Sequence, residues 1–309
     1  MNEKNPLTLD AAENVFFGEQ LNYVKARTYD VVNKDLKALT LLPVSTEGDP
    51  GAETISYKSY DAVGMAKIVA DYATDFPRTD LIGEEVTLKV KSLGSSYGYS
   101  IQEIRRAQMA GVQLETRRAT AARRAIDELQ DKIAWFGDAK AKLNGFLTAS
   151  GTNVYVAADN AAGTSKAWAN KTADEIVADI AGIITAGPVA TNGKEVPDTL
   201  LLPLSLYNLI MNTPYGSNRD KTILGFLREN YPQITRIDWV SELATAGASG
   251  ASRVVAYSRD PNKVEVQIPL RMEQLPAQQK GMEFEVICHQ RTAGVAIYYP
   301  MSVTYCDGL

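Results

Sequence analysis

The pattern of hydrophobic and polar positions predicts two strands before residue 95. Residues 84–93 alternate, with Leu88 and Val90 on the same face, which is the period of a strand with one buried side. Residues 53–60 alternate in the same way. The segment that joins them, residues 61–83, is too long for an ordinary hairpin turn inside a compact domain. We therefore expect a hairpin that projects from the body and whose tip is shaped by neighbouring molecules.

A single long helix is predicted next, from Ser100 to Phe136, because no proline interrupts this stretch. Ser100 with Glu103 forms a capping-box pattern at its start, and Gly137 supplies a C-terminal stop. The apolar stripe of its second half consists of Ile126, Leu129, Ile133 and Phe136. About 36 residues at 1.5 Å each would give a helix of roughly 54 Å. A compact chain of this length is only about 50 Å across, so the helix would span the molecule.

The remaining segments predict short helices and many strands. Residues 1–45 contain one helical pattern followed by an irregular stretch, and the segment after Phe146 has the low charge and the glycines of a loop. Residues 172–187 have the period of an amphipathic helix, with Thr172 as its N-cap. Residues 198–205 indicate a buried strand, and alternating segments make the last third of the chain rich in strands.

Composition and charge narrow the class of protein. The chain has 309 residues, of which 45% are hydrophobic and 22% charged, as expected of a globular protein. Its net charge of −5 does not indicate a nucleic-acid-binding protein. Neither a signal peptide nor a run of 18 apolar residues is visible, so we expect a cytosolic protein without a membrane partner. Cys288 and Cys306 fit buried thiols better than a disulfide.

Motifs for catalysis or ligand binding are lacking in the sequence. His289, the only histidine, lies in an alternating strand without metal-ligand spacing around it, which favours a structural role. Nucleophile-elbow, dinucleotide and phosphate-loop motifs are absent. The adjacent carboxylates of Glu84 and Glu85, and of Asp127 and Glu128, point in different directions. We expect no catalytic residue, no cofactor and no metal site.

Arginine doublets on the long helix are the most distinct charged feature. At roughly 100° per residue, Arg106, Arg117 and Arg124 fall near one direction, opposite the apolar stripe. One interpretation, which we favour, is a solvated face with local pairs such as Arg124 with Glu128. The other is a basic face turned toward an acidic partner or packaged nucleic acid.

In a single subunit, the predicted elements would leave much of the chain exposed to solvent. A loose N-terminal arm, a projecting hairpin and a helix as long as the molecule do not minimise the surface of a single subunit. The missing burial must therefore come from copies of the same chain.

Several extended phrases resemble the major capsid proteins of tailed phages. The phrases are PGAETISY, YDAVGMAKIV, SYGYSIQEIRRA and ARRAIDELQDKIAWFGD, and the C-terminal RTAGVAIYYPMSVTYCDGL resembles the strand that closes this fold. The resemblance covers nearly the whole chain. It implies an α+β fold, the tailed-phage capsid fold, which encapsulins share.

The resemblance also implies how the chain is divided. The expected parts are an N-terminal arm (1–45), an extended E-loop hairpin (46–95), a peripheral domain with a long spine helix (96–159), an axial domain (160–262) and a return to the peripheral domain (263–309). The E-loop residues expected to contact neighbouring subunits are Met65, Lys67, Ile68, Tyr72, Phe76 and Arg78. Trp135 and Phe136 would anchor the end of the spine helix to the sheet.

The function implied is that of a major capsid protein, a structural subunit and not an enzyme. Hexamers and pentamers of the chain would form an icosahedral shell, assembled in the bacterial host cytoplasm, that becomes the virion capsid. Its partners would be a separate scaffolding protein, a portal and non-specifically bound double-stranded DNA; the sequence leaves decoration proteins open. In some relatives an E-loop lysine forms an isopeptide bond, but no asparagine partner for Lys67 is identified here.

Two alternatives to a phage capsid remain at this point. An encapsulin-like shell would share the fold and enclose a protein cargo. A soluble enzyme of another class would need catalytic motifs that the sequence does not supply.

Overall fold

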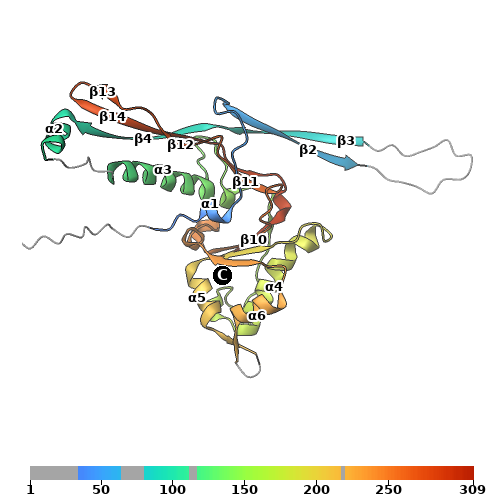
Figure 1. The fold of residues 1–309 in the computed structure, drawn as a ribbon. Coiled ribbons are helices and arrows are strands. Elements are labelled where there is room, and N and C mark those ends of the chain that lie inside the picture. The colour runs from blue at the N-terminus through green and yellow to red at the C-terminus, as the bar shows by residue number, and fades with distance from the viewer. Residues whose placement is uncertain (1–33, 64–79, 111–116, 217–219) are drawn as a thin grey trace, which may run out of the picture. The chain divides into compact units, whose positions relative to one another are not determined.

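The computed structural model describes residues 34–63, 80–110, 117–216 and 220–309. The chain divides into two units, residues 1–35 and residues 36–309. The elements labelled in Figure 1 all belong to the second unit, which combines helices with several sheets. This mixture confirms the predicted α+β fold.

A five-stranded mixed sheet forms the centre of the C-terminal half. Its order is β5 (Asn153–Val154), β16 (Val303–Asp307), β10 (Arg253–Tyr257), β6 (Thr199–Leu202) and β9 (Arg236–Trp239). β10 is antiparallel to both of its neighbours, whereas the two outer pairs are parallel. Leu200 and Leu202 face one hydrophobic core and Leu201 faces another. Because both faces are covered, three consecutive leucines are buried in β6, and the predicted buried strand is confirmed.

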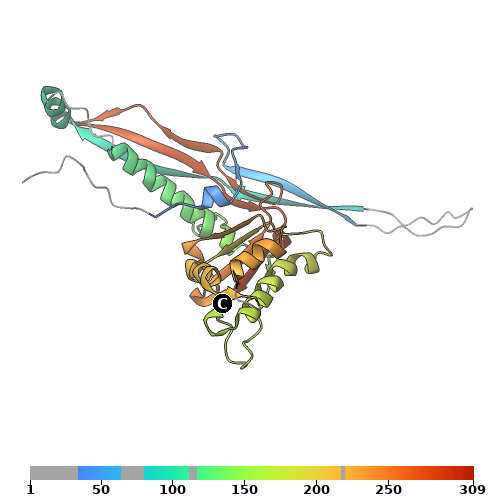
Figure 2. The ribbon, with the colours of Figure 1, turned by 60° about the horizontal axis from the view of Figure 1, so that its bottom comes forward.

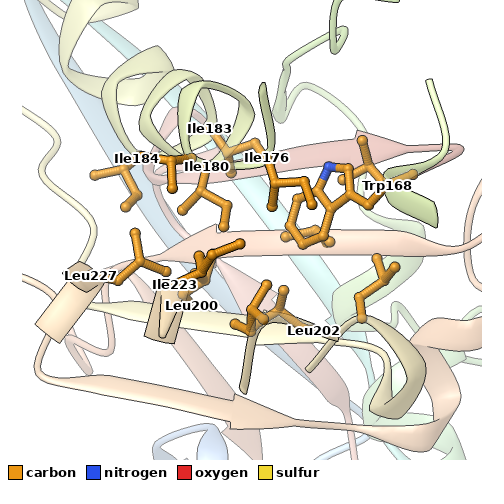
Figure 3. Close-up of a cluster of buried hydrophobic side chains, with 14 of the residues drawn as sticks. Trp168, Ile176, Ile180, Ile183, Ile184, Leu200, Leu202, Ile223 and Leu227 are labelled. Carbon is orange, nitrogen blue, oxygen red and sulfur yellow. The ribbon is translucent and has the colours of Figure 1, made fainter. Parts of the chain in front are cut away.

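Three helices cover one face of this sheet. They are α4 (Ala173–Ala190), α5 (Leu204–Asn212) and α6 (Ile223–Asn230). Figure 3 shows the isoleucines of α4 pointing toward Leu200, Leu202 and Trp168. Thr172 and Glu175 form a complete capping box, which confirms the predicted start of α4.

The opposite face packs against a second layer. This layer contains α1 (Ala38–Leu41), the end of α3 (Arg117–Phe136) and a three-stranded sheet of β1 (Val44–Ser45), β11 (Val264–Gln267) and β15 (Gly294–Ile297). Trp135 of α3 is fully buried, with its ring 6.1 Å from that of Phe146. Asp131 of α3 accepts the backbone N–H of Ala38 at 2.9 Å, which fixes α1 against α3.

A third sheet lies along α3 (Figure 2). β4 (Lys91–Ser100) is antiparallel to β14 (Glu283–Thr292) over all ten residues, and β12 (Leu270–Gln274) and β13 (Gln278–Lys280) pair with the other edge of β14. Ile126 and Ile133 of α3 pack against Leu93 and Cys288 of this sheet. The sheet therefore supports α3 along its apolar stripe.

β4 corrects one sequence-based expectation. The predicted alternating segment ends at residue 93, before Gly94 and Gly98, yet both glycines lie inside β4. The continuous ladder with β14 outweighs their low strand propensity. Gly98 also allows a close approach, because a Cβ there would lie 3.1 Å from the carbonyl oxygen of Phe284.

The hairpin before β4 consists of β2 (Thr54–Val63) and β3 (Asp80–Lys89). The two strands pair in register from Thr54 opposite Lys89 to Val63 opposite Asp80. A shorter hairpin joins β7 (Pro214–Tyr215) to β8 (Lys221–Thr222). The predicted hairpin strands are thus present, but the predicted second strand, residues 84–93, spans the end of β3 and the start of β4.

The predicted single long helix is wrong. The structure describes α2 (Ile101–Ala110) and α3 as separate helices. In one continuous helix, Glu103 and Arg118 would lie about 22 Å apart, because each residue advances the axis by about 1.5 Å. Instead Arg118 Nη2 donates to Glu103 Oε1 at 2.9 Å. This ion pair favours the non-collinear arrangement, and Gly111, between the helices in sequence, is a poor helix former.

The end of α3 requires glycine at two positions. Gly137 has a φ of +68° and directly follows the last helical residue, which confirms the predicted stop. A Cβ at Gly137 would lie 2.3 Å from the carbonyl oxygen of Leu143, and one at Gly145 would lie 2.2 Å from the nitrogen of Gly137. The chain can turn back beneath α3 only because both side chains are absent.

Candidate functional site

The hairpin is the first candidate surface for contact between copies. The six residues predicted to contact neighbours lie outside the described residues: Met65, Lys67, Ile68, Tyr72, Phe76 and Arg78. The described strands beside them, β2 and β3, expose charged side chains such as Lys58 and Glu85, which lie opposite each other in the register. The structure thus describes the base of this surface.

The base of the hairpin is anchored by a small core and by tyrosines. Leu88 and Val90 are buried against alanines of the β14–β15 region. The rings of Tyr57 and Tyr298 meet edge to face at 4.7 Å. The hydroxyl of Tyr298 donates to Glu265 at 3.1 Å, and burial together with this carboxylate raises the pKa of Tyr298 to about 12. The hairpin base is therefore fixed to the body by apolar and polar contacts.

A second candidate surface is the corner where α2, α3 and β4 meet. Arg118 of α3 donates to the carbonyl oxygen of Gly98 at 2.6 Å and to Glu103 at 2.9 Å. Its guanidinium lies 5.0 Å from the ring centre of Tyr99. The hydrogen bond from Arg118, followed by that from the backbone N–H of Ser100, lowers the pKa of Glu103 to about 2. The predicted capping box of Ser100 and Glu103 is confirmed, and it is joined to α3 by an arginine.

The three arginines predicted to share a face lie on two helices. Arg106 is on α2, whereas Arg117 and Arg124 are on α3. Because α2 and α3 do not continue one another, the direction calculated for a single helix does not apply to Arg106. Arg124 donates to Glu128 at 2.7 Å, which is the local pair expected of a solvated face. A contact of these arginines with nucleic acid stays a prediction.

The four predicted core residues of α3 differ in burial. The exposed fraction is 2% for Ile126, 4% for Ile133 and 44% for Leu129, and Phe136 is half-buried. The placement of Leu129 in the core is wrong. On a helical wheel the buried stripe extends from Ile126 toward Ala134, about 80° to one side, while Leu129 lies about 60° to the other side.

Exposed apolar side chains form features that sequence reasoning missed. Met109 at the end of α2 is 86% exposed and Met282 before β14 is 66% exposed. Val154 and Val189 are also mostly exposed, on β5 and at the end of α4, two elements that contact each other. Large exposed apolar side chains are candidates for burial between molecules. Hydrophobic periodicity could not find them, because it does not reveal which faces of a helix or strand remain uncovered.

The described residues contain little that suggests chemistry. Among them no group of three or more histidine, cysteine or acidic side chains could hold a metal ion. His289 lies 3.9 Å from a carboxylate oxygen of Glu273. Both cysteines are buried, and burial raises the pKa of the Cys306 thiol to about 11. In the part of the chain that the structure covers, no helix has the length and apolar character needed to span a bilayer.

Comparison with known proteins gives one family and a consistent fold. A family model described as "Major capsid protein" matches residues 64–309. No curated protein sequence matches the chain. The capsid of Myoviridae phage XM1 aligns with a TM-score of 0.79 at 21% identity, covering 96% of this chain and 99% of that one.

Two further solved structures share the fold more loosely. The chain from Mycobacterium phage Bobi aligns with a TM-score of 0.61 at 14% identity, covering 93% of this chain and 94% of that one. The virus-like particle from Pyrococcus furiosus aligns with a TM-score of 0.56 at 13% identity, covering 87% and 91%. At these identities the likeness concerns the fold.

Proposed function

Because this chain belongs to the major capsid protein family, we propose that it builds the icosahedral shell that encloses the double-stranded DNA of a tailed phage. Membership of the family makes the chain a shell-forming structural subunit of a virion capsid. The observation that carries the proposal is the family match from residue 64 to the last residue, supported by the alignment with a Myoviridae phage capsid over almost the full length of both chains. The encapsulin-like alternative is not favoured, because the matching family is that of capsid proteins.

The finer organisation of the shell is part of this proposal. Copies of the chain form hexamers and pentamers in the host cytoplasm, with a separate scaffolding protein and a portal. The role is structural and requires no catalytic residue. DNA is contained by the wall, and contacts to its phosphates are independent of sequence.

The parts of the chain have distinct roles in the proposed shell. Residues 46–95 form the E-loop, with its base on β15 and its tip on a neighbouring subunit. Residues 96–159 and 263–309 form the peripheral domain, in which α3 is the spine helix. Residues 160–262 form the axial domain, and residues 1–45 the arm. The separate cores of the α3–β14 region and of the α4–α6 region support two regions of this kind. β5 and β16, which these bounds assign to the peripheral domain, instead belong to the five-stranded sheet that α4–α6 cover.

Electron microscopy of the purified recombinant chain tests the proposal. We expect closed icosahedral particles, formed by the chain alone or together with the scaffolding protein of its own virus. A chain that stays monomeric at every concentration and salt, with or without that scaffold, would overturn it. Particles that enclose a specific protein and exclude DNA would instead support the encapsulin-like alternative.

A further inference from the structure

A cleft lined by basic side chains lies where three distant segments meet. Its volume is about 520 Å³. We call it the lysine cleft. The basic residues that line it are Lys89, Lys91, Lys140, Lys142 and Arg291. Glu53 is the one acidic residue among the lining residues. The cleft is thus strongly cationic on a chain whose net charge is −5.

Strand alternation places two of the lysines on the same side. Leu88 and Val90 are 4% and 6% exposed and face the core beneath the hairpin base. Side chains alternate along an extended chain, so Lys89 and Lys91 point away from that core, and both are exposed. The junction between β3 and β4 therefore holds two positive charges at one wall of the cleft.

A tight turn after α3 presents the next two lysines. Asp138 and Leu143 exchange backbone hydrogen bonds of 2.9 Å, and the Asp138 carboxylate accepts the N–H groups of Lys140 and Ala141. Leu143 is buried and holds the turn to the body. Lys140 and Lys142 are exposed at its tip. The turn fixes the backbone and leaves both ammonium groups to the solvent.

Arg291 of β14 completes the cleft. Its Nη1 donates to the carbonyl oxygen of Pro50, while its Nε is buried without a hydrogen-bond partner in the described residues. A buried N–H of a guanidinium without an acceptor is unfavourable. Its positive charge is thus not neutralised by a carboxylate of the described chain.

The lysine cleft differs in pairing from the arginines of the helices. Arg118, Arg123 and Arg124 each lie within 4.0 Å of a carboxylate on their own chain. Within residues 34–63, 80–110, 117–216 and 220–309, none of the five cleft cations has such an ion pair. Unpaired, exposed lysines are the typical partners of phosphate groups, because an ammonium ion binds them without a fixed geometry.

We propose that the lysine cleft binds phosphate groups of the nucleic acid enclosed by the shell. This inference rests on the proposed function, because it takes the ligand from inside the particle. It assigns the phosphate contacts to the β3–β4 junction, the turn after α3 and β14, and not to the arginine face of the helices. Contacts of this kind recognise the backbone and carry no sequence information.

Fluorescence anisotropy with a labelled 30-base-pair duplex, measured over a series of salt concentrations, tests the proposal. The variant carries Lys91→Gln, Lys140→Gln and Lys142→Gln. Losing three phosphate contacts should lower the slope of log affinity against log salt by roughly three and weaken binding at least ~10-fold at low salt. Arg291 stays unchanged, because it also contacts Pro50 and its loss could disturb the fold.

Three further variants make the result specific. The same lysines changed to arginine should retain binding. Three exposed lysines elsewhere, changed by Lys58→Gln, Lys132→Gln and Lys194→Gln, form the matched control and should bind as the unaltered chain does. A third variant neutralises the helix face with Arg106→Gln, Arg117→Gln and Arg124→Gln.

The outcomes separate this inference from the proposed function. Equal binding by the lysine-cleft variant and the unaltered chain would overturn the inference, as would a larger loss in the arginine variant. A lysine-cleft variant that binds the duplex normally but forms no particles would identify a contact between copies and also overturn it. Absence of particles from the unaltered chain with its scaffold would count against the proposed function instead, whatever the duplex binding.

Discussion

At Gly145 the backbone passes Gly137 so closely that a single methyl group cannot be added. A Cβ at Gly145 would lie 2.2 Å from a backbone nitrogen, an atom that cannot move without unwinding the end of α3. Gly145→Ala should therefore destabilise the subunit by more than about 2 kcal/mol, seen as a lower melting temperature. Gly94→Ala is the control, because its nearest neighbour is 3.8 Å away. Equal melting temperatures for the two variants would contradict this reason.

Lys171 and Asp179 form an ion pair inside the α4 region. Their side chains are 1% and 5% exposed and their charged atoms lie 2.5 Å apart. Trp168 Nε1 also donates to Asp179, at 2.9 Å. Lys171→Met leaves this carboxylate buried without its counter-ion, so we expect a loss of about 3–5 kcal/mol in urea denaturation.

A second substitution checks the cause of that loss. Asp179→Asn in the Lys171→Met background removes the unpaired charge and keeps an acceptor for Trp168. The double variant should therefore be more stable than Lys171→Met alone. A double variant that is less stable would show that the loss arises from packing and not from the buried charge.

Ile126 and Leu129 of α3 show that a shared hydrophobic pattern does not ensure equal burial. Ile126 is 2% exposed and Leu129 is 44% exposed, although the sequence places both in the same stripe. Ile126→Ala should cost about 2–4 kcal/mol of unfolding free energy, because it opens a cavity against the β4–β14 sheet. Leu129→Ala should cost at most about 1 kcal/mol in the unassembled subunit. Similar losses of unfolding free energy at both positions would show that Leu129 belongs to the core.

At the scale of elements, the sequence predicts those helix ends and strands that depend on residues close together in the chain. Thr172 as N-cap locates the start of α4, and the apolar run 200–202 locates a strand buried on both faces. Gly137 locates the end of α3. Each of these features depends on residues within one turn of helix or one strand, so no knowledge of the fold is needed.

Elements determined by distant partners could not be predicted in this way. β4 runs through Gly94 and Gly98 because β14, almost 200 residues later, supplies a complete ladder. α2 and α3 are separate because Arg118 returns to Glu103 and to the end of β4. Helical periodicity depends only on residues a few positions apart, so it cannot predict a contact between distant residues.

The ion pair between Glu103 of α2 and Arg118 of α3 should weaken in acid. The pKa of Glu103 is about 2 in the folded chain, below that of a free carboxyl, chiefly because of the hydrogen bond from Arg118. A lowered pKa gives stability that is complete above about pH 4.5 and is lost as the pH falls toward 2. The difference in stability between the unaltered chain and Glu103→Gln should therefore be largest at neutral pH. Hydrogen exchange of α2 measures it; a difference that does not change with pH would contradict the assignment.

At the scale of the whole molecule, the candidate surfaces follow from the fold and not from motifs. The lysine cleft is lined by the β3–β4 junction, residues 140–142 and Arg291, which are far apart in the chain. No local sequence pattern can therefore predict it. The E-loop residues could be named from the resemblance, but they lie outside the described residues, and their contacts with a neighbour stay a prediction. The exposure of Met109 and Met282 likewise depends on which faces the fold leaves uncovered.

Removing the E-loop tip should separate folding from assembly. In the proposed shell, residues 64–79 contact a neighbour, while the hairpin base is held by its own chain through Leu88 and Val90. Replacing 64–79 with a short Gly-Ser linker should leave the melting temperature of the subunit nearly unchanged and prevent closed particles. Electron microscopy and a thermal melt of the same sample measure both. Normal particles from this variant would rule out an essential contact at the tip.

The two cysteines have a practical consequence for labelling. They are the only cysteines in the sequence, and both are fully buried. A maleimide dye should therefore leave the native subunit unmodified, because neither buried thiol is accessible, and burial also raises the pKa of the Cys306 thiol. Replacing the exposed Lys194 by cysteine would give every copy one addressable position, and the native thiols would not need to be removed first.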